Sequence, residues 1–452
     1  PHMCTDNYLR QSKRRGSEQR HRCPDCDNLF IDATLLLWTI SRMFMLDMIQ
    51  TVAFAGIVVF AGYGIRKIIP VLARYNLPAP VLGGLVIALI NLAARGLGRT
   101  PFTFDTSLQA PLMTAFFTSI GFGSSLMLFR TGGPKILSFL IIAILFTIIQ
   151  NAIGIAVAVP LGQHPLFGVF NSSVTLVGGP ATGLAFAPLF EKAGVPGASS
   201  LAVASAMTGI LCGGLIGAPI GTWLIERYRL RHGTDSPIPG PVPASTEIVE
   251  EQIPETDAAS PSGEDPSAYV LLKNLVAILA AMWIGYWISR GFTALGMTLP
   301  AYIGAMFAGA IIRNLADFTG IISLSQRSID DIGTVSLTIF IAMAMMTLKL
   351  WELAGVALPM LAVVVAQVVI VGAACFWPLF RLFGKDYDGA VTCAGFCGFM
   401  LGTTANAMAS MESLVERYGP AKRAFLVVPI VGAFFIDFAN AIIITVFLNL
   451  FK

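Results

Sequence analysis

A series of about ten apolar stretches, each close to 20 residues long, constrains the fold of this 452-residue chain more than any other feature. A helix of about 20 apolar residues crosses the hydrocarbon core of a bilayer, which is about 30 Å thick. Only 12% of the residues are charged, whereas average soluble proteins have about 25%. A transmembrane β-barrel would need segments that alternate in polarity, but the run from Ile141 to Val159 is apolar on both faces. The sequence therefore predicts an all-α polytopic membrane protein.

A polar segment divides the apolar stretches into two sets that are alike in number and rhythm. Residues 232–267 contain seven prolines, eight acidic residues and no lysine or arginine, a composition that cannot bury a core. We predict four parts. They are a polar, basic N-terminal tail with an interfacial helix (1–45), a first transmembrane repeat (46–231), a disordered cytoplasmic linker (232–267) and a second, inverted transmembrane repeat (268–452).

Short local matches also suggest an internal repeat. The tripeptide Leu77–Ala79 opens an apolar stretch as Leu299–Ala301 does 222 positions later, and Gly179 has a counterpart at Gly402, 223 positions later. Each match alone is weak. The alternative is a chance similarity, because the sequence is composed largely of a few apolar residue types. Together with the matching rhythm of the stretches, they favour two repeats.

The fifth stretch of each half is rich in Gly, Ser, Thr and Asn, where its neighbours are aliphatic. Gly-interrupted segments at corresponding positions of two halves indicate a transporter binding site. We predict that both are re-entrant hairpins; the alternative is that Gly179 and Gly183 form a helix-packing face. The predicted substrate-binding residues are Asn171, Ser172, Ser173, Thr175, Gly178, Gly179 and Thr182 in the first hairpin, and Gly402, Thr403, Thr404 and Asn406 in the second.

The charge distribution tests this topology. If the hairpins do not cross, each half crosses five times, and the second half enters with the opposite orientation. Placing the start of the first span outside leaves sixteen basic residues in the cytoplasm and six outside, as the positive-inside rule requires. The seven basic residues before the first span disagree, because they would also lie outside.

The sequence lacks the motifs of an enzyme or an ATP-driven pump. Gly384-Lys385 is followed by Asp386 and does not form a phosphate-binding loop, and no nucleophile with a base lies on facing spans. The net charge of +3 is too small to suggest a nucleic-acid partner. We therefore predict no catalytic residues and no organic cofactor.

A few polar residues lie deep in the apolar stretches. With the limits predicted for these stretches, Asp437 is the only ionisable residue among them. Intramembrane acids are costly and suggest an ion or proton site. Asn440 follows three positions later and therefore shares a helix face with Asp437. We predict that Asp437, Asn440 and Asn151 bind Na⁺; the alternative for Asp437 is a structural hydrogen bond. An anionic substrate would meet backbone N–H groups and helix N-termini.

From Leu46 onward the chain resembles the bacterial sodium/glutamate symporters (the ESS family). The most specific stretches are Ala424–Ala441, Leu348–Leu361, Gln150–Ala156 and Cys397–Gly402. The resemblance implies Na⁺-coupled symport of glutamate across the bacterial inner membrane, an inverted repeat with two re-entrant loops and contact with membrane lipid. It also implies a homodimer and an elevator-like movement of a transport domain.

Two positions depart from the family pattern. This chain has Pro180-Ala181 where the family has a His-Gly pair, and Thr404-Ala405-Asn406 where it has a Thr-Pro-Thr run. These positions lie where a substrate would be recognised, so a carrier of another amino acid or small carboxylate is the close alternative. A channel is the alternative from a different class.

Overall fold

The structure is a computed structural model that describes residues 45–74, 77–96, 102–230, 266–294, 300–320 and 323–451. The predicted tail lies outside the described residues except for Met45, and so does the predicted linker except for Pro266 and Ser267. Helices make up nearly all of the described chain, which confirms the all-α prediction. The exception is a two-residue parallel pair of strands, β1 (Met45–Leu46) and β2 (Thr103–Phe104).

The first half contains long helices interrupted near its fifth apolar stretch. Asp47 and Gln50 form a reciprocal capping box at the start of the first helix, which satisfies two backbone N–H groups. The elements are α3 (Met48–Ile68), α4 (Pro70–Arg74), α5 (Ala79–Gly96), α6 (Gln109–Gly123), α7 (Met127–Ala158), η1 (Val159–Leu161), α8 (Pro165–Val169), η2 (Phe170–Val177), α9 (Gly179–Lys192) and α10 (Ala198–Tyr228).

The second half follows the same order. Asp386 caps the first helix of its fifth stretch by accepting from Gly389 N at 2.7 Å. The elements are α12 (Pro266–Ala294), α13 (Ala301–Thr319), α14 (Gln326–Met346), η3 (Leu350–Leu353), α15 (Ala357–Ala374), η4 (Cys375–Leu379), α16 (Phe380–Leu382), α17 (Tyr387–Leu401), α18 (Thr404–Tyr418), α19 (Lys422–Ile430), η5 (Val431–Phe435) and α20 (Ile436–Leu450).

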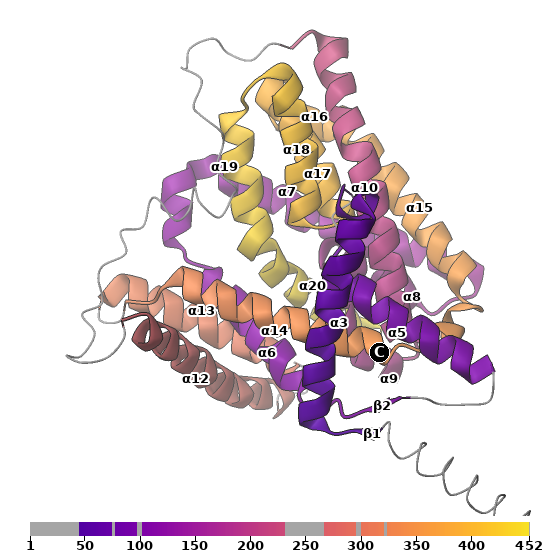
Figure 1. Cartoon of the computed structure of the whole chain (residues 1–452). Helices are drawn as coiled ribbons and strands as arrows, with labels where there is room; N and C mark the ends of the chain where they lie inside the picture. Colours follow the sequence, from indigo (N-terminus) through magenta and orange to yellow (C-terminus); the bar gives the residue numbers. More distant parts are fainter. Residues whose placement is uncertain are drawn as a thin grey trace, which may run out of the picture.

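The helices pack as two groups that each combine parts of both halves (Figure 1). The six-helix bundle consists of α3, α5, α6, α12, α13 and α14; the broken-helix bundle consists of α7 to α10 and α15 to α20. The extensive helix contacts lie within one bundle or the other, whereas the contacts of α9 with α14 and of η5 and α20 with α6 are sparse. The two bundles are therefore distinguished by their close backbone contacts, although one cluster of buried hydrophobic side chains runs across both.

Aromatic rings fill part of the junction between the bundles. Phe186 of α9 meets Tyr302 of α13 edge-on with ring centroids 5.3 Å apart, and Phe438 of α20 meets Phe307 of α13 at 5.0 Å. Such pairs contribute about 0.5–1.5 kcal/mol each beyond the area they bury. Tyr302 and Phe340 of the six-helix bundle belong to the same buried cluster as Phe186 of the broken-helix bundle, so the junction is a continuous apolar contact.

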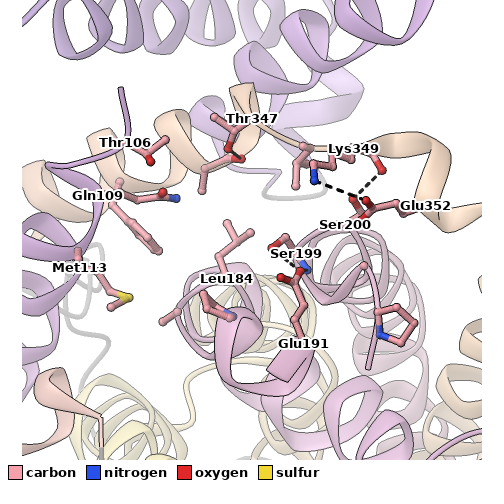
Figure 2. Close-up of a pocket in the computed structure, with 18 of the residues that line it drawn as sticks. Thr106, Gln109, Met113, Leu184, Glu191, Ser199, Ser200, Thr347, Lys349 and Glu352 are labelled. Carbon is pink, nitrogen blue, oxygen red and sulfur yellow. Dashed lines mark hydrogen bonds and ion pairs between the residues drawn. The ribbon is translucent and has the colours of Figure 1, made fainter. Parts of the chain in front are cut away.

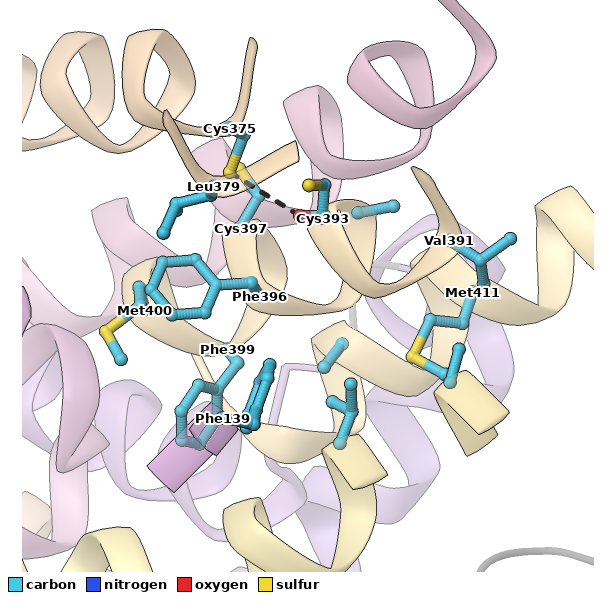
Figure 3. Packing of buried hydrophobic residues seen from close by; sticks show 14 of the residues in the cluster. Phe139, Cys375, Leu379, Val391, Cys393, Phe396, Cys397, Phe399, Met400 and Met411 are labelled. Carbon is cyan, nitrogen blue, oxygen red and sulfur yellow. Dashed lines mark hydrogen bonds between the residues drawn. The ribbon is translucent and has the colours of Figure 1, made fainter. Parts of the chain in front are cut away.

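The core of the broken-helix bundle is built around α17 (Figure 3). Phe396 packs edge-on against Phe139 and Phe146 of α7, with ring centroids 5.8 and 5.4 Å apart. On another face, Gly209 and Gly213 of α10 lie against the end of α17, where an added Cβ at Gly209 would collide with the Leu401 carbonyl. Small residues thus allow close helix approach.

Within the described part of the chain, six helices are long and apolar enough to cross a membrane: Met48–Ile68, Pro134–Leu161, Ala198–Tyr228, Ala268–Ala294, Gln326–Met346 and Ala357–Leu382. This number is smaller than the count of apolar stretches, because other stretches form shorter or interrupted helices such as α5 and α19 to α20. The finding still supports a multi-pass membrane protein.

One basic residue is buried within a helix of the described chain. Helix α13 continues to Thr319, so that Arg313 lies inside it and is only 8% exposed. Its Nε lies 3.0 Å from Asp317 Oδ1, and its Nη1 donates to Gln326 Oε1 at 3.1 Å. A buried charge is tolerated when it is paired and hydrogen-bonded, and Arg313 lies in the six-helix bundle, away from the predicted site residues.

Candidate functional site: two helix breaks that meet

The first break lies in the fifth stretch of the first half. The backbone leaves helical geometry at Asn171 (φ −83°, ψ 15°) and Ser172 (φ −117°, ψ −112°). Gly179 then adopts a left-handed φ of +67°, a conformation that costs other residues about 1–2 kcal/mol. Pro180 follows at the start of α9, where its missing N–H is not needed. The Gly-Gly-Pro sequence thus ends one helix and begins the next.

The second break has the same layout. Helix α17 ends at Leu401, Gly402 and Thr403 are non-helical, and α18 begins at Thr404. An added Cβ at Gly402 would lie 2.5 Å from Asn406 Nδ2 and 3.1 Å from the Gly398 carbonyl. Only glycine fits here without displacing a neighbour. The two helices around this break pack against each other, which is the geometry of a hairpin.

The structure brings the two breaks together. An added Cβ at Gly179 would lie 3.6 Å from Thr403 Cγ2, although these residues are 224 positions apart. Helices α9 and α18 both begin at this meeting point, so two helix N-termini converge on it. Each N-terminus carries partial positive charge and backbone N–H groups. The meeting point is therefore suited to an anion.

Buried polar atoms surround the first break. Asn440 Nδ2 donates to the Ser173 carbonyl at 3.0 Å, and Ser173 N donates to Asn151 Oδ1 at 3.2 Å. Among the described residues, Asn440 Oδ1, Ser173 Oγ and Asn171 Oδ1 are buried without a hydrogen-bond partner. A buried polar atom without a partner is costly and calls for an explanation such as a bound ion or water.

The predicted Na⁺ ligands have different surroundings. Asn440 is fully buried against Ser173, as described above. Asn151 Oδ1 accepts from Ser173 N, which places Asn151 beside the first break. Asp437 lies one turn before Asn440 on α20 and is half-buried, and its carboxylate forms no hydrogen bond or ion pair with the described part of the chain.

Other predicted residues support the backbone of the two breaks. Thr175 Oγ1 pairs with Ser205 Oγ of α10 at 2.8 Å. Thr404 Oγ1 donates to the Gly432 carbonyl at 2.8 Å, and Asn406 Nδ2 donates to the Ile210 carbonyl at 2.7 Å. The side chain of Thr182 packs beneath Gly178. These side chains hold the hairpins in place, and Thr403 presents its methyl group to Gly179.

Two further polar residues belong to this region. Gln150 of α7 and Gln367 of α15 are fully buried and contact the second and first hairpin, respectively. The sequence places both deep in apolar stretches, which is the signal that could have identified them. Ser205 has no comparable signal, because a serine between small residues is ordinary in a helix-packing face.

A cavity of about 650 Å³ lies beside this region, between α9 and α10 on one side and α6 and α14 on the other (Figure 2). Glu191 accepts from Ser199 Oγ at 3.0 Å, and Lys349 Nζ lies 3.8 Å from Glu352 Oε1. Its lining on α9 begins at Leu184, more than one helical turn beyond Gly179, and includes none of the predicted site residues. We regard this cavity as neighbouring the site rather than forming it.

Comparison with known proteins identifies relatives over most of the chain. Residues 44–420 match the profile described as "Sodium/glutamate symporter". The sodium/glutamate symporters of Escherichia coli (strain K12) and Shigella flexneri are each 38% identical over 409 residues, which cover 90% of this chain and 99% of each relative. The sodium/glutamate symporter of Haemophilus influenzae is 37% identical over 398 residues, 88% of this chain and 96% of the relative. The chain belongs to the sodium/glutamate symporter family.

Proposed function

We propose that this protein carries glutamate across a membrane together with Na⁺, and that both bind where the two helix breaks meet. The single observation that carries the proposal is the approach of Gly179 to Thr403 at the N-termini of α9 and α18. The relatives are named sodium/glutamate symporters. The protein is a transporter rather than an enzyme, and Na⁺ is its coupling ion.

Glutamate carboxylates would bind at the two N-termini. No buried lysine or arginine of the described chain lies beside the breaks, so backbone N–H groups and helix dipoles supply the positive potential. Gly178 and Gly179 on one side, and Gly402 next to Thr403 on the other, place no side chain between the backbone and the proposed ligand. Thr182, Thr404 and Asn406 keep these segments in place. Pro180 and Ala181 provide no side-chain donor, which leaves recognition to the backbone.

Na⁺ would bind beside the substrate, on the side of α20. Hard cations prefer oxygen ligands. Asn440 Oδ1, Ser173 Oγ and Asn171 Oδ1, near the first break, are among the buried oxygens that lack a hydrogen-bond partner within the described chain. Asp437, one turn away, supplies a negative charge in a region of low dielectric. Na⁺ and the anionic substrate would then stabilise each other electrostatically.

We propose that the two bundles move relative to each other during transport, with the broken-helix bundle carrying the site. The junction is apolar and has few close backbone contacts, which supports this elevator-like movement, because an apolar contact can slide with few specific interactions to exchange. Distances between spin labels on α6 and α17, measured with and without Na⁺ and glutamate, test it; an unchanged distance distribution under all conditions would count against the movement. The homodimer and the bacterial inner membrane stay predictions.

We also propose that the halves are inverted repeats with re-entrant hairpins. Helices α13, α17, α18 and α19 begin 222 to 225 residues after α5, α8, α9 and α10, their counterparts in the first half. Single cysteines at the exposed positions Lys192 and Glu416, at the ends of the two hairpins, should label from opposite sides of the membrane. A membrane-impermeant maleimide, applied to variants without other accessible cysteines, measures this. Labelling of both positions from one side would contradict the inversion.

Uptake into proteoliposomes tests the proposed function. Labelled glutamate should accumulate when Na⁺ is high outside, should saturate with glutamate concentration, and should not accumulate when choline replaces Na⁺. A panel of other amino acids and dicarboxylates added as competitors tests the alternative substrates. Flux that neither saturates nor depends on the Na⁺ gradient would indicate a channel and reject the proposal.

A further inference from the structure

Gln150 and Gln367 are fully buried polar side chains that the proposed binding sites do not use. They lie on different helices, α7 and α15, and each contacts a different hairpin. Burial of an amide is costly unless it is hydrogen-bonded. The hydrogen bonds that each buried amide forms therefore indicate what it does in the protein.

The two glutamines form one chain of hydrogen bonds between the hairpins. Gln150 Nε2 donates to the Met400 carbonyl at 3.1 Å, in the last turn of α17. Gln367 Nε2 donates to the backbone carbonyl of Gln150 and to Ser172 Oγ, each at 2.8 Å. Ser172 Oγ in turn donates to the Gly168 carbonyl at 2.7 Å. The first and second hairpins are thus joined through two helices.

Both ends of this chain fall where helix geometry is interrupted. The last carbonyls of a helix have no partner within it, so Gln150 satisfies one that α17 leaves free. Ser172 is one of the two residues, with Asn171, at which the first hairpin becomes non-helical. Gly154 of α7 allows this close approach, because an added Cβ would collide with Ser172 Oγ.

The ends also lie next to the proposed ligand groups. Ser172 precedes Ser173, whose carbonyl accepts from Asn440 on the side proposed for Na⁺. Met400 lies two residues before Gly402, on the side proposed for the substrate carboxylates. A shift of either break would therefore lengthen a hydrogen bond that continues to the other break.

We propose that Gln150 and Gln367 are positioning residues that couple Na⁺ binding to substrate binding by linking the two helix breaks. The proposal rests on the function proposed above. Coupling of this kind is reciprocal: each ligand raises the affinity for the other by the same factor. Neither glutamine touches glutamate or Na⁺; each acts through the backbone segment that it holds.

A purely stabilising role explains these residues less well. Gln150 Oε1 and Gln367 Oε1 are both buried without a hydrogen-bond partner in the described chain, and such atoms oppose folding. Methionine has a similar length and no amide, so that it would fill the same space without these unpaired oxygens. We therefore expect the methionine variants to fold.

The test is the Na⁺ dependence of glutamate binding to purified protein in lipid nanodiscs. The coupling factor is the ratio of the glutamate Kd at low Na⁺ to the Kd at saturating Na⁺. Gln150→Met and Gln367→Met should each reduce this factor about fivefold or more, the low end of typical coupling. The double variant should lose no more than the larger single loss, because both residues belong to one chain.

Asn91→Leu is the matched control. Asn91 of α5 donates to the Met346 carbonyl at the end of α14 at 3.3 Å, and its Oδ1 lacks a hydrogen-bond partner among the described residues. It thus has the chemistry of Gln150 but lies in the six-helix bundle. This variant should keep the wild-type coupling factor. Equal losses in Asn91→Leu and the glutamine variants would overturn the proposal.

Other outcomes of these measurements also test the coupling proposal. Folded glutamine variants with a wild-type coupling factor would overturn the proposal while leaving the proposed function intact. If a methionine variant does not fold, Ser172→Ala removes only the hydroxyl that Gln367 contacts and should show the same loss; an unchanged factor would again reject the coupling role. If Na⁺ does not alter the glutamate Kd in the wild type, the proposed function fails, and the coupling proposal fails with it.

Discussion

Valine at Gly179 or Gly402 should abolish Na⁺-driven glutamate uptake. At Gly179 the left-handed backbone disfavours any side chain, and a β-branched one most of all. At Gly402 the added atoms would overlap Asn406 and the Gly398 carbonyl. Either change moves a helix N-terminus away from the meeting point. We expect initial uptake rates to fall at least tenfold, equivalent to a loss of about 1.4 kcal/mol or more.

The control is Gly56→Val in α3, where an added Cβ meets nothing within 4 Å. This variant should take up glutamate at nearly the wild-type rate. If Gly179 and Gly402 served only helix packing, their valine variants would lose expression and assembly rather than activity. Near wild-type uptake by both folded valine variants would remove the proposed site.

Replacing Asp437 by asparagine should raise the Na⁺ concentration for half-maximal uptake at least tenfold. The charge of a carboxylate in a poorly screened region favours a nearby cation by several kcal/mol, and asparagine keeps the shape but lacks the charge. The apparent KM for glutamate at saturating Na⁺ should change much less. Titrating uptake against Na⁺ at two pH values measures both effects.

Three outcomes separate the roles of Asp437. A rightward shift of the Na⁺ curve at both pH values supports a ligand or near-ligand role. A changed pH profile with an unaltered Na⁺ curve would indicate a proton relay. An unchanged Na⁺ curve at both pH values would assign Asp437 a structural role and leave Asn440, Ser173 and Asn171 as the Na⁺ ligands to test.

The sequence predicted much of the local structure. The apolar run from Ile141 to Ala158, for example, lies within α7 as the all-α prediction requires. Both helix breaks occur at the expected glycines. The left-handed backbone at Gly179 and the crowded position of Gly402 each favour glycine, which can be recognised in the sequence. Helices and helix breaks depend on residues that are close together in the sequence. Apolar runs and glycines therefore suffice to predict them.

Contacts between distant parts of the chain could not be predicted from the sequence in the same way. The approach of Gly179 to Thr403 and the bond from Gln367 to Ser172 join residues about 200 positions apart. A single polar residue in an apolar stretch indicates that a partner exists but does not identify it. For this reason Asn151 was predicted as a Na⁺ ligand without its observed partner, Ser173 N, and the ligand role stays a prediction. The division into two bundles likewise depends on contacts between the halves.

The most direct test of the account is an experimental structure determined with Na⁺ and glutamate. The account predicts density for glutamate between Gly179 and Thr403, with its carboxylates toward the first residues of α9 and α18. Na⁺ should lie against Asn440 and Ser173. Glutamate bound instead in the cavity beside Lys349 and Glu191, with the two helix breaks free of ligand, would contradict the central claim.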